Sequence, residues 1–508
     1  MLWTIVLSVS VVVAIKVATC EPLPIEITGL GWHSPQAIFP SRYFFVWNKP
    51  VSAVVITSPA DDRACRVWQQ VFNETNFADK LVTIVRYKLV GDVCRGGIQI
   101  DVYGNDQSSS QPMARRVVTE DIWSEKCVCR RHDWPQLMKC REMSQQFKQI
   151  DSDLSIFNTS DGIDFDKVLD EMKSRFAEHR RSYSFCHYQV INNQAYKHCY
   201  GEYIGFAQFW DEMLRSLLSK TYIPDIEFVA NLGDWPLSDK RTKPPLPVMS
   251  WCGSTDSNDI VLPTYELTES TLQMQGRVTL DVLSVFGKQS VKFDDKKEML
   301  FWRGRDSNEN RLKLIRLSKN HTSLINASLT NFFFFRDQMD ELGPKSPYVS
   351  FFDFFQYKYQ LNIDGTVAAY RLPYLLAGNS VVLKQESKYY EFFYHLLKPD
   401  VHYIAVDKEL NNLVDNIDHL IKLNDSNNGS NNLWQLITES RQLVLDNLLP
   451  QHIYCYHMNF IDRYSSLLKN KIVLRPEMTK VFVDSDTDCH CDDQQQQQAD
   501  QLRDRQEL

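Results

Sequence analysis

A candidate general base lies in the segment Asn231–Pro236, which reads Asn-Leu-Gly-Asp-Trp-Pro. Asp234 follows an apolar run that we expect to form a buried strand, so its carboxylate would stand at the carboxyl end of that strand. A carboxylate in this place can accept a proton from a hydroxyl nucleophile. Gly-Asp-x-Pro is also a common turn sequence, so a purely structural role for Asp234 stays open.

Three arginines gather around the next candidate, a strand end and the helix that follows it. Arg303 and Arg305 end an apolar strand, and Arg311 lies at the start of a helical pattern. Guanidinium groups form bidentate contacts with phosphate oxygens, so the cluster predicts a phosphate site. Asp306 or Ser307 is predicted to cap the helix. Surface salt bridges are the alternative use of these arginines.

A strand–glycine–helix turn is predicted at residues 359–376. The strand ends at Asp364-Gly365-Thr366, and we expect a helix to open at Val367-Ala368-Ala369-Tyr370-Arg371 and to stop at Gly378. Gly365 would let the backbone approach a ligand, and the unpaired N–H groups at a helix start bind phosphate without a metal. The same turn also occurs in α/β proteins as a structural feature alone.

Together these segments predict an enzyme that uses a nucleotide-sugar donor. A base on one side of a cleft would face diphosphate-binding groups on the other, where they stabilise the charge that develops as the bond to the sugar breaks. The rival design holds Mn²⁺ or Mg²⁺ with an Asp-x-Asp pair after a buried strand. Asp151-Ser152-Asp153 flanks a helix and Asp484–Asp488 lies in a polar tail, so the sequence predicts no metal.

The order of apolar runs predicts an α/β fold preceded by an all-β domain. Residues 24–125 carry short β runs without a convincing helix, which is typical of an immunoglobulin-like antiparallel β-sandwich. After Cys140, amphipathic helices alternate with apolar strands, which predicts parallel sheets covered by helices. We expect two Rossmann-like halves, 126–290 and 291–482, with a ligand cleft between them. The expected elements are helices at 165–179 and 204–218 and strands at 226–230, 248–251, 299–302, 359–363, 380–383 and 403–406.

Both ends of the chain predict the lumen of the endoplasmic reticulum. Residues 1–20 form an apolar run that ends in small residues, as in a secretory signal peptide. Residues 483–508 form a polar tail that ends in Arg505-Gln506-Glu507-Leu508, a variant of the signal read by the retrieval receptor. A net charge of −8 argues against a nucleic-acid partner. The chain has no second long apolar run, so the sequence predicts no membrane span. Six Asn-x-Ser/Thr sequences fit a lumenal protein: Asn73, Asn158, Asn320, Asn326, Asn424 and Asn428.

Eleven cysteines remain after the signal segment, and in an oxidising compartment most should form disulfides. Because eleven is odd, at least one thiol is free or intermolecular. The expected pairings are Cys65 with Cys94, and Cys455 with one of Cys127, Cys129 and Cys140. Zinc is the alternative for two groups, although neither has the C-x₂-C spacing: Cys127, Cys129 and His132, and Cys489-His490-Cys491.

Several segments closely resemble the KDEL motif-containing protein O-glucosyltransferases of the endoplasmic reticulum. They are residues 231–236, 250–256, 302–306, 330–335, 362–374 and 381–385, with Tyr389-Tyr390-Glu391. The resemblance covers essentially the whole chain. It implies a filamin-type immunoglobulin-like repeat at 24–125, followed by a GT-B pair of Rossmann-like domains.

The resemblance also implies an inverting, metal-independent transfer of glucose from UDP-glucose to serine in EGF-like repeats, with Notch and fibrillins as typical acceptors. Xylose from UDP-xylose stays open. By position, Asp234 matches the catalytic base, Arg311 matches a donor-binding arginine, and Arg305 falls at a nucleotide-sugar contact. Residues 366–371 match the donor loop. Glu386 stands where relatives carry an acid that could hold ribose or sugar hydroxyls.

The chain departs from this family in two places. It ends in Arg-Gln-Glu-Leu rather than Lys-Asp-Glu-Leu, and Cys199 sits where close relatives lack a cysteine, so a Cys186–Cys199 bridge is a hypothesis. A second class of function stays open, a lumenal chaperone or adaptor that binds client proteins through its β-sandwich. Asp234 and Arg311 argue against that class.

Overall fold

The computed structural model describes Cys140 and residues 143–158, 162–177, 183–272, 282–287, 291–347, 349–425 and 429–481, with the backbone of seven strands before them. No helix within these residues is long and apolar enough to cross a bilayer. The predicted signal segment, the polar tail, the Cys65–Cys94 pair and both zinc alternatives lie outside the described residues.

The N-terminal strands form two antiparallel sheets. One has the order β1-β2-β5-β4 and the other the order β3-β6-β7. The strands are β1 (Leu23–Ile25), β2 (Ser41–Trp47), β3 (Val51–Thr57), β4 (Arg66–Phe72), β5 (Leu81–Val90), β6 (Ile98–Gly104) and β7 (Ala114–Val118). The β-rich character of residues 24–125 is as expected, and the packing of the two sheets as a sandwich stays a prediction.

The next sheet, called the first sheet below, is mixed. Its strands in spatial order are β13 (Ile260–Val261), β11 (Val248–Ser250), β10 (Ile226–Asn231), β8 (Phe185–Ile191), β9 (Gln194–Tyr200) and β20 (Thr479–Lys480). β10, β11 and β13 are parallel, whereas β8, β9 and β20 pair antiparallel. The expectation of a parallel sheet is therefore wrong for half of it. A hairpin accounts for the β8–β9 pairing, and its turn residues Asn192 and Asn193 have φ of 49° and 58°.

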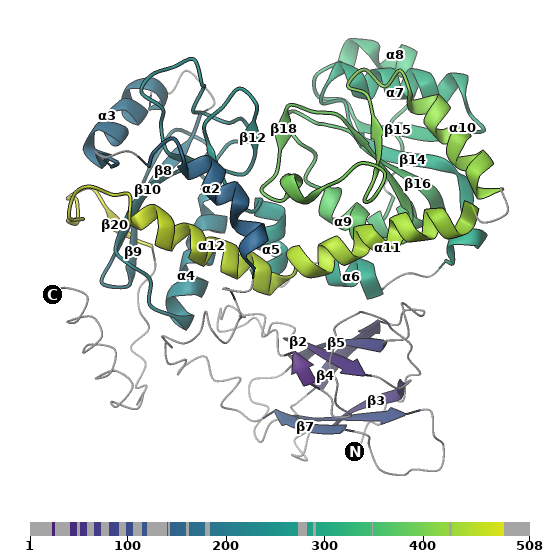
Figure 1. Ribbon diagram of the computed structural model, residues 1–508, viewed down its shortest axis with the longest axis horizontal. Helices are drawn as coiled ribbons and strands as arrows, with labels where there is room; N and C mark the ends of the chain where they lie inside the picture. Colours follow the sequence, from purple (N-terminus) through teal and green to yellow (C-terminus); the bar gives the residue numbers. More distant parts are fainter. Residues whose placement is uncertain are drawn as a thin grey trace.

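The second sheet is parallel throughout, as expected. Its strands in spatial order are β15 (Ile325–Asn331), β14 (Lys297–Arg305), β16 (Tyr357–Asn362), β17 (Val381–Gln385) and β19 (Ile404–Val406). β16 is buried along its whole length, because helices cover both faces of a parallel sheet. In Figure 1 the two sheets lie side by side, the first on the left and the second on the right.

Helices cover the two sheets. They are α2 (Lys148–Leu154), α3 (Phe165–Phe176), α4 (Ala207–Lys220), α5 (Tyr265–Leu272), α6 (Val282–Gly287), α7 (Glu309–Asn320), α8 (Met339–Leu342), α9 (Leu372–Ala377), α10 (Leu413–Asn424), α11 (Gly429–Asn447) and α12 (Pro450–Ser465). The predicted helices at 165–179 and 204–218 correspond to α3 and α4. α3 buries Phe165, Val168, Leu169 and Met172, which lie on one helical face.

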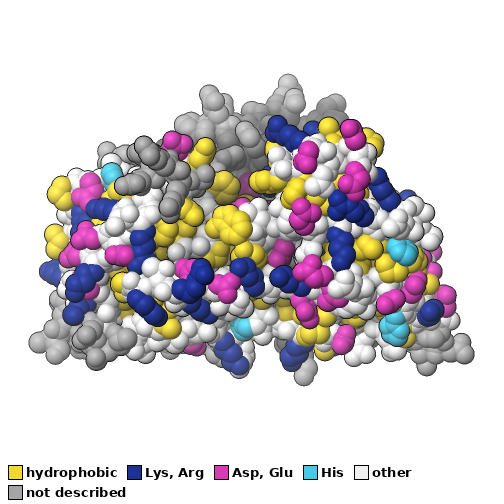
Figure 2. All heavy atoms as spheres, turned by 90° about the horizontal axis from the view of Figure 1, so that it is seen from above, with side chains coloured by type: hydrophobic (Ala, Val, Ile, Leu, Met, Phe, Trp, Pro, Cys, Tyr) yellow, Lys and Arg dark blue, Asp and Glu magenta, His cyan; other side chains and the backbone are white. Residues whose placement is uncertain are grey.

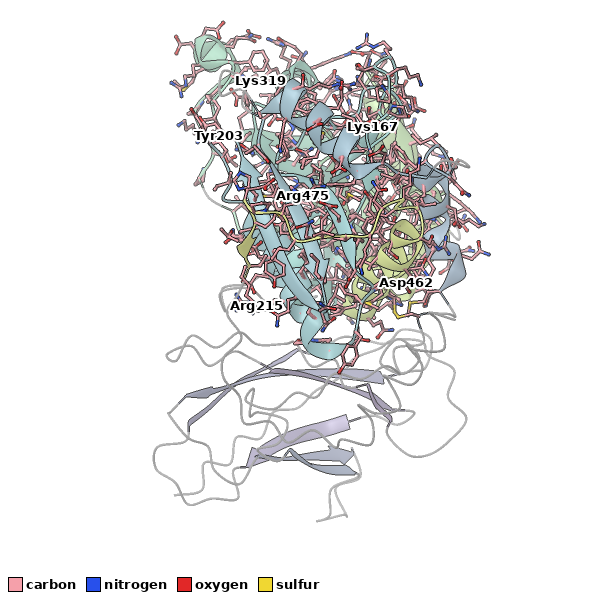
Figure 3. The ribbon with its side chains drawn as sticks, turned by 90° about the vertical axis from the view of Figure 1, so that its left-hand side faces the viewer. Lys167, Tyr203, Arg215, Lys319, Asp462 and Arg475 are labelled. Carbon is pink, nitrogen blue, oxygen red and sulfur yellow. A yellow bond between two sulfur atoms is a disulfide. The ribbon has the colours of Figure 1, made fainter. Side chains whose placement is uncertain are left out.

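The chain returns to the first sheet at its C-terminal end. α12 contacts β10, and β20 pairs with β9. Residues 450–481 thus pack with the first sheet, although the predicted second half extends to 482. In Figure 1 α11 and α12 follow one another along the lower edge of both sheets. Arg475, labelled in Figure 3, lies in the extended segment before β20, and its guanidinium donates to Glu227 of β10 and to Asp166 of α3.

Two disulfides join described residues. Cys140 pairs with Cys455 of α12, which confirms the expected partner of Cys455 and ties α12 to a residue 315 positions earlier. Cys186 pairs with Cys199 across the β8–β9 hairpin, which confirms the hypothesis for that pair. Cys252 is a buried free thiol.

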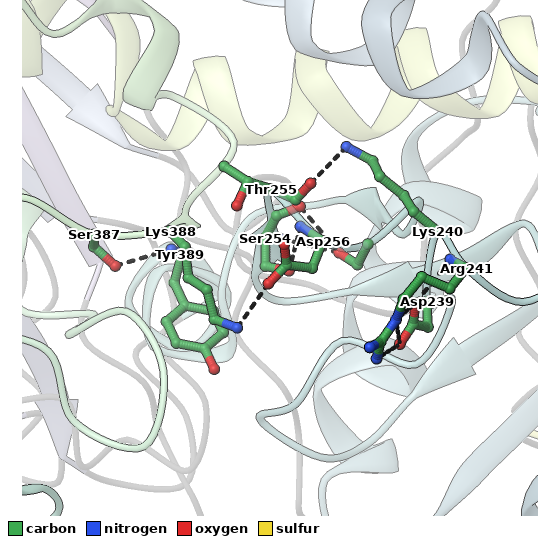
Figure 4. A network of polar contacts seen from close by, with 10 residues as sticks. Asp239, Lys240, Arg241, Ser254, Thr255, Asp256, Ser387, Lys388 and Tyr389 are labelled. Carbon is green, nitrogen blue, oxygen red and sulfur yellow. Dashed lines mark hydrogen bonds and ion pairs between the residues drawn. The ribbon is translucent and has the colours of Figure 1, made fainter.

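A short two-stranded sheet links the two parts of the molecule. β12 (Gly253–Ser254) comes from the first part and pairs antiparallel with β18 (Tyr389–Tyr390) of the second. Thr255 donates its N–H to the carbonyl of Lys388, whose ammonium group pairs with Asp256 at 2.7 Å. Figure 4 shows this link. The contact fixes the strand ends of the first sheet relative to those of the second.

Candidate active site

A cavity of about 590 Å³ lies where the strand ends of the two sheets meet. We call it the central cavity. The first sheet and α5 supply Asp234, Tyr265 and Glu266 to its wall. The second part supplies the other lining residues: Arg303, Gly304, Arg305, Ser307, Arg311, Thr330, Ser346, Val349, Phe351, Phe354, Gly365, Thr366, Val367, Ala368, Ala369, Tyr370, Arg371 and Tyr374. The carboxyl ends of strands in open α/β sheets are the usual ligand site.

Asp234 reaches the central cavity from the loop after β10. Asn231, the last residue of β10, shapes this loop, because its side chain accepts from the Gly233 N–H and donates to the Trp235 carbonyl. The carboxylate of Asp234 accepts no hydrogen bond from any described residue. Burial raises its pKa above the ordinary value of 3.8, and the charge of Arg305 partly opposes that shift. A partly desolvated, unpaired carboxylate is suited to accept a proton.

Arg305 of β14 and Arg311 of α7 line the same cavity as Asp234 but differ in their surroundings. Arg305 is exposed at the end of β14, with its guanidinium 5.6 Å from the ring centroid of Phe333. Arg311 is buried, and it donates to the carbonyls of Asp364, Arg305 and Ile363 and to the Ser307 hydroxyl. Burial lowers the pKa of Arg311 to about 9, with the Arg371 charge acting in the same direction. One of its five N–H donors has no partner among the described residues.

Arg303 and Arg371 complete the basic wall of the cavity. Arg303 donates to the carbonyls of Trp302 and Asn326 and to the Asn326 side chain, so it joins β14 to β15. Arg371 donates to the Arg303 carbonyl at 2.7 Å. Burial lowers the pKa of both guanidinium groups. The charges of Arg305 and Arg371 also lower the pKa of Arg311, so these three cations repel one another and a bound polyanion would relieve that repulsion.

The glycine turn adopts a different form from the one expected. Residues 364–371 form an irregular loop, and α9 begins only at Leu372, with Pro373 in its first turn. Proline is favoured at a helix start because its missing N–H has no partner there. The predicted helix opening at Val367 is therefore wrong, although residues 365–371 do line the central cavity as a loop. Gly365 is tightly packed, since a Cβ there would lie 3.1 Å from Arg311 Nη2 and would displace that group slightly.

Asn308 caps α7, so the predicted cap at Asp306 or Ser307 is wrong. Its side chain accepts from the Arg311 N–H at 3.0 Å and donates to the carbonyls of Asp364 and Gly365. Asp306 instead accepts from the backbone N–H groups of residues 333–335. Although burial raises the pKa of Asp306, these N–H groups lower it below its ordinary value. Asn308 therefore joins the helix start to the glycine loop, a role that its sequence position did not reveal.

Tyr265 and Glu266 are lining residues that sequence reasoning missed. They begin α5, just beyond the carboxyl end of β13, and β13 has only two residues. The Tyr265 ring packs edge-on against Tyr370 at 5.4 Å. The rule that ligands bind at the carboxyl ends of strands would have pointed to these residues, but so short a strand leaves no clear apolar run.

Glu386 lies outside the central cavity lining. Its side chain is exposed just after β17, and its N–H donates to the Val406 carbonyl at 2.7 Å. Its role toward ribose or sugar hydroxyls stays a prediction. The Asp151-Ser152-Asp153 motif also contributes no residue to the lining: Asp151 pairs with Arg463, and Asp153 accepts from Gln149 and from the Val261 N–H.

The central cavity places an unpaired carboxylate opposite a basic, glycine-containing wall, so a hydroxyl acceptor and a diphosphate donor could meet there. Fold and cavity together are consistent with a glycosyltransferase that uses an activated sugar. Residues 138–506 match glycosyl transferase family 90, and the chain belongs to this family.

Related proteins agree with the class. The chain is 39% identical over 477 residues to protein O-glucosyltransferase 2 of Danio rerio, and the match covers 90% of each chain. It is 38% identical over 414 residues to protein O-glucosyltransferase 3 of Homo sapiens, covering 80% of this chain and 78% of the relative. Protein O-glucosyltransferase 1 of Homo sapiens is 27% identical over 299 residues, or 57% of this chain and 74% of the relative. The catalytic interpretation is thus favoured over the adaptor.

Proposed function

We propose that the protein transfers glucose from UDP-glucose to a serine hydroxyl of EGF-like repeats, with inversion and without a metal. The observation that carries the proposal is the meeting of Asp234 with Arg305, Arg311 and the Gly365 loop in one cavity. The names of the relatives support a glucosyl donor and a protein acceptor. Xylose from UDP-xylose is the alternative donor.

The reaction is one in-line displacement. Asp234 accepts the serine proton, and the serine oxygen attacks the anomeric carbon from the face opposite UDP. The bond from that carbon to the diphosphate oxygen breaks, so the α-linked sugar of the donor becomes β-linked in the product. Arg305, Arg311 and the loop amides after Gly365 stabilise the charge on the departing diphosphate. No step needs a redox partner or a metal-bound water.

We further propose that the protein works in the lumen of the endoplasmic reticulum, on folded repeats of Notch and fibrillin type. The two disulfides support an oxidising compartment. The exposed side chains of Asn158 and Asn320, both in Asn-x-Ser/Thr sequences, are also compatible with a lumenal glycoprotein. The GT-B arrangement and the filamin-type N-terminal repeat belong to the same proposal, and the terminal Arg-Gln-Glu-Leu would be read by the retrieval receptor.

The test incubates the purified full-length protein with a folded EGF-like repeat and with UDP-glucose or UDP-xylose. Mass spectrometry locates the added sugar, and NMR of the glycopeptide gives its anomeric configuration. Addition of one β-linked hexose to serine in the presence of EDTA supports every part of the proposed reaction. An α-linked product, or a strict requirement for a divalent cation, would contradict the mechanism. If saturating UDP fails to raise the melting temperature, the adaptor class would gain support instead.

A further inference from the structure

Glu266 is a cavity residue that the proposed reaction does not yet use. It lies in the first turn of α5, and its backbone is held on two sides. The Tyr374 hydroxyl donates to the Glu266 carbonyl at 3.2 Å, and the neighbouring Tyr265 ring packs against Phe206 at 4.8 Å and Tyr370 at 5.4 Å. Glu266 therefore lines the central cavity from a fixed backbone position.

The carboxylate of Glu266 has no hydrogen-bond donor among the described residues. Arg371 is the cation that acts on it most strongly, but the two side chains form no ion pair within 4 Å. Burial raises the pKa of Glu266 to about 7, while Arg371 lowers it and Glu269 and Asp234 raise it further. A desolvated acid without a donor destabilises the empty protein, since buried polar groups otherwise pair.

The position of Glu266 in the cavity limits which ligand group could donate a hydrogen bond to its carboxylate. Glu266 and Asp234 line the same cavity, and the charge of Asp234 raises the pKa of Glu266, so Glu266 lies on the same side of the cavity as the proposed base. A diphosphate would be repelled by a carboxylate, and it is matched instead by the arginines on the opposite wall. Sugar hydroxyls are donors, and carboxylates commonly hold them in binding sites.

On the basis of the proposed function, we infer that Glu266 binds the donor sugar, accepting hydrogen bonds from hydroxyls of the hexose ring. Glu266 would then select the sugar, while the arginines bind the nucleotide regardless of the sugar attached. A change at Glu266 should therefore alter the affinity for UDP-glucose without altering the affinity for UDP.

The test measures binding of UDP and of UDP-glucose by calorimetry, without an acceptor, to the full-length wild type and to Glu266→Gln. Glutamine keeps the size of the side chain but removes the charge, and hydrogen bonds to charged groups are worth roughly tenfold to a hundredfold in affinity. We expect the Kd for UDP-glucose to rise by about tenfold or more and the Kd for UDP to change by less than about threefold. Glu269→Gln, on the same helix but outside the cavity lining, should change neither.

Two outcomes would overturn the inference. An equal loss of UDP and UDP-glucose binding would mean that Glu266 affects the basic wall of the cavity rather than the sugar. Unchanged binding of both ligands, whatever the effect on turnover, would remove it from sugar recognition. Failure of the wild type itself to bind UDP would contradict the proposed function rather than this inference, so the two failures are distinguishable.

Discussion

The basic and acidic sides of the central cavity differ in their hydrogen bonds to the rest of the protein. Most arginine side chains on the basic side are hydrogen-bonded to other described residues, whereas the carboxylates on the acidic side are not. The guanidinium groups of Arg303, Arg311 and Arg371 all donate to backbone carbonyls of the second part. The carboxylates of Asp234 and Glu266 accept no hydrogen bond from any described residue, and burial raises the pKa of both. The donor side is thus preorganised for a polyanion, and the acidic side is left free to meet hydroxyl groups.

The most severe test of this contrast is Asp234→Asn. An amide cannot accept the serine proton, so kcat for transfer should fall roughly 10²–10⁴-fold. Because the basic wall is intact, the Kd for UDP should stay within about threefold of the wild type. Steady-state transfer to an EGF-like repeat and calorimetric titration with UDP measure the two effects. A variant with full turnover would show that Asp234 is not the base.

Arg311→Ala tests whether the basic side is held as described. The buried guanidinium bridges three backbone carbonyls, so its loss should cost roughly 2–4 kcal/mol in the free energy of unfolding and should also weaken UDP binding. Urea unfolding and UDP titration measure the two effects.

The matched control is Arg305→Ala, which removes an exposed side chain. It should weaken UDP binding without changing the free energy of unfolding by more than about 0.5 kcal/mol. If both variants lose UDP affinity and neither loses stability, the view that Arg311 also stabilises the fold, whereas Arg305 serves binding alone, is contradicted.

The pH dependence of kcat/KM tests the acidic side. The base must be ionised, and burial raises the pKa of Asp234 above 3.8, so activity should rise with pH through a pKa above that value. Below this pKa the rate should fall about tenfold per pH unit. Glu266, with a pKa of about 7, titrates nearby, and Glu266→Gln should remove its contribution to the profile. A flat profile between pH 4 and pH 7 in both proteins would contradict the assignment.

Glycine substitutions give the smallest expected effect. A Cβ at residue 365 would lie 3.1 Å from Arg311 Nη2, so Gly365→Ala should displace the guanidinium slightly and weaken UDP binding roughly three- to tenfold. At Gly233, beside Asp234, the nearest atom to an added Cβ would be Asn231 Oδ1 at 3.6 Å, so Gly233→Ala should leave UDP binding unchanged. An equal loss of UDP affinity in the two variants would mean that the backbone is packed equally tightly on the basic and the acidic side of the cavity.

Three strands of the second sheet, β14, β17 and β19, could be predicted because each contains a continuous apolar run. β15 was missed because Asn326, Ser328 and Thr330 interrupt its apolar pattern, although all of its core-facing residues are buried. The β8–β9 hairpin was missed for a related reason. Its turn is Asn-Asn, without the glycine that usually marks such a turn, and β9 carries polar residues such as Lys197.

The cavity residues that lie directly after or at the end of a long strand could be predicted from the sequence. The conformation of the loops that carry the other cavity residues could not. Asp234 follows β10, Arg305 ends β14 and Arg311 comes soon after it, and both strands contain clear apolar runs. The loop at 365–371 has helix-forming residues, but contacts from distant residues decide its conformation: Asn308 holds the Gly365 carbonyl and Arg311 holds that of Asp364. Helix propensity gives way to such tertiary contacts. The surface gives no comparable signal, since Figure 2 shows Lys and Arg interspersed with Asp and Glu on the described part of that face.

An experimental structure with UDP bound tests the central claim most directly. The account predicts that the diphosphate contacts Arg305, Arg311 and the backbone after Gly365, with the Asp234 carboxylate facing the free end of the β-phosphate, where the sugar would begin. Electron density for UDP at any other place, or a diphosphate turned away from Asp234, would contradict the account.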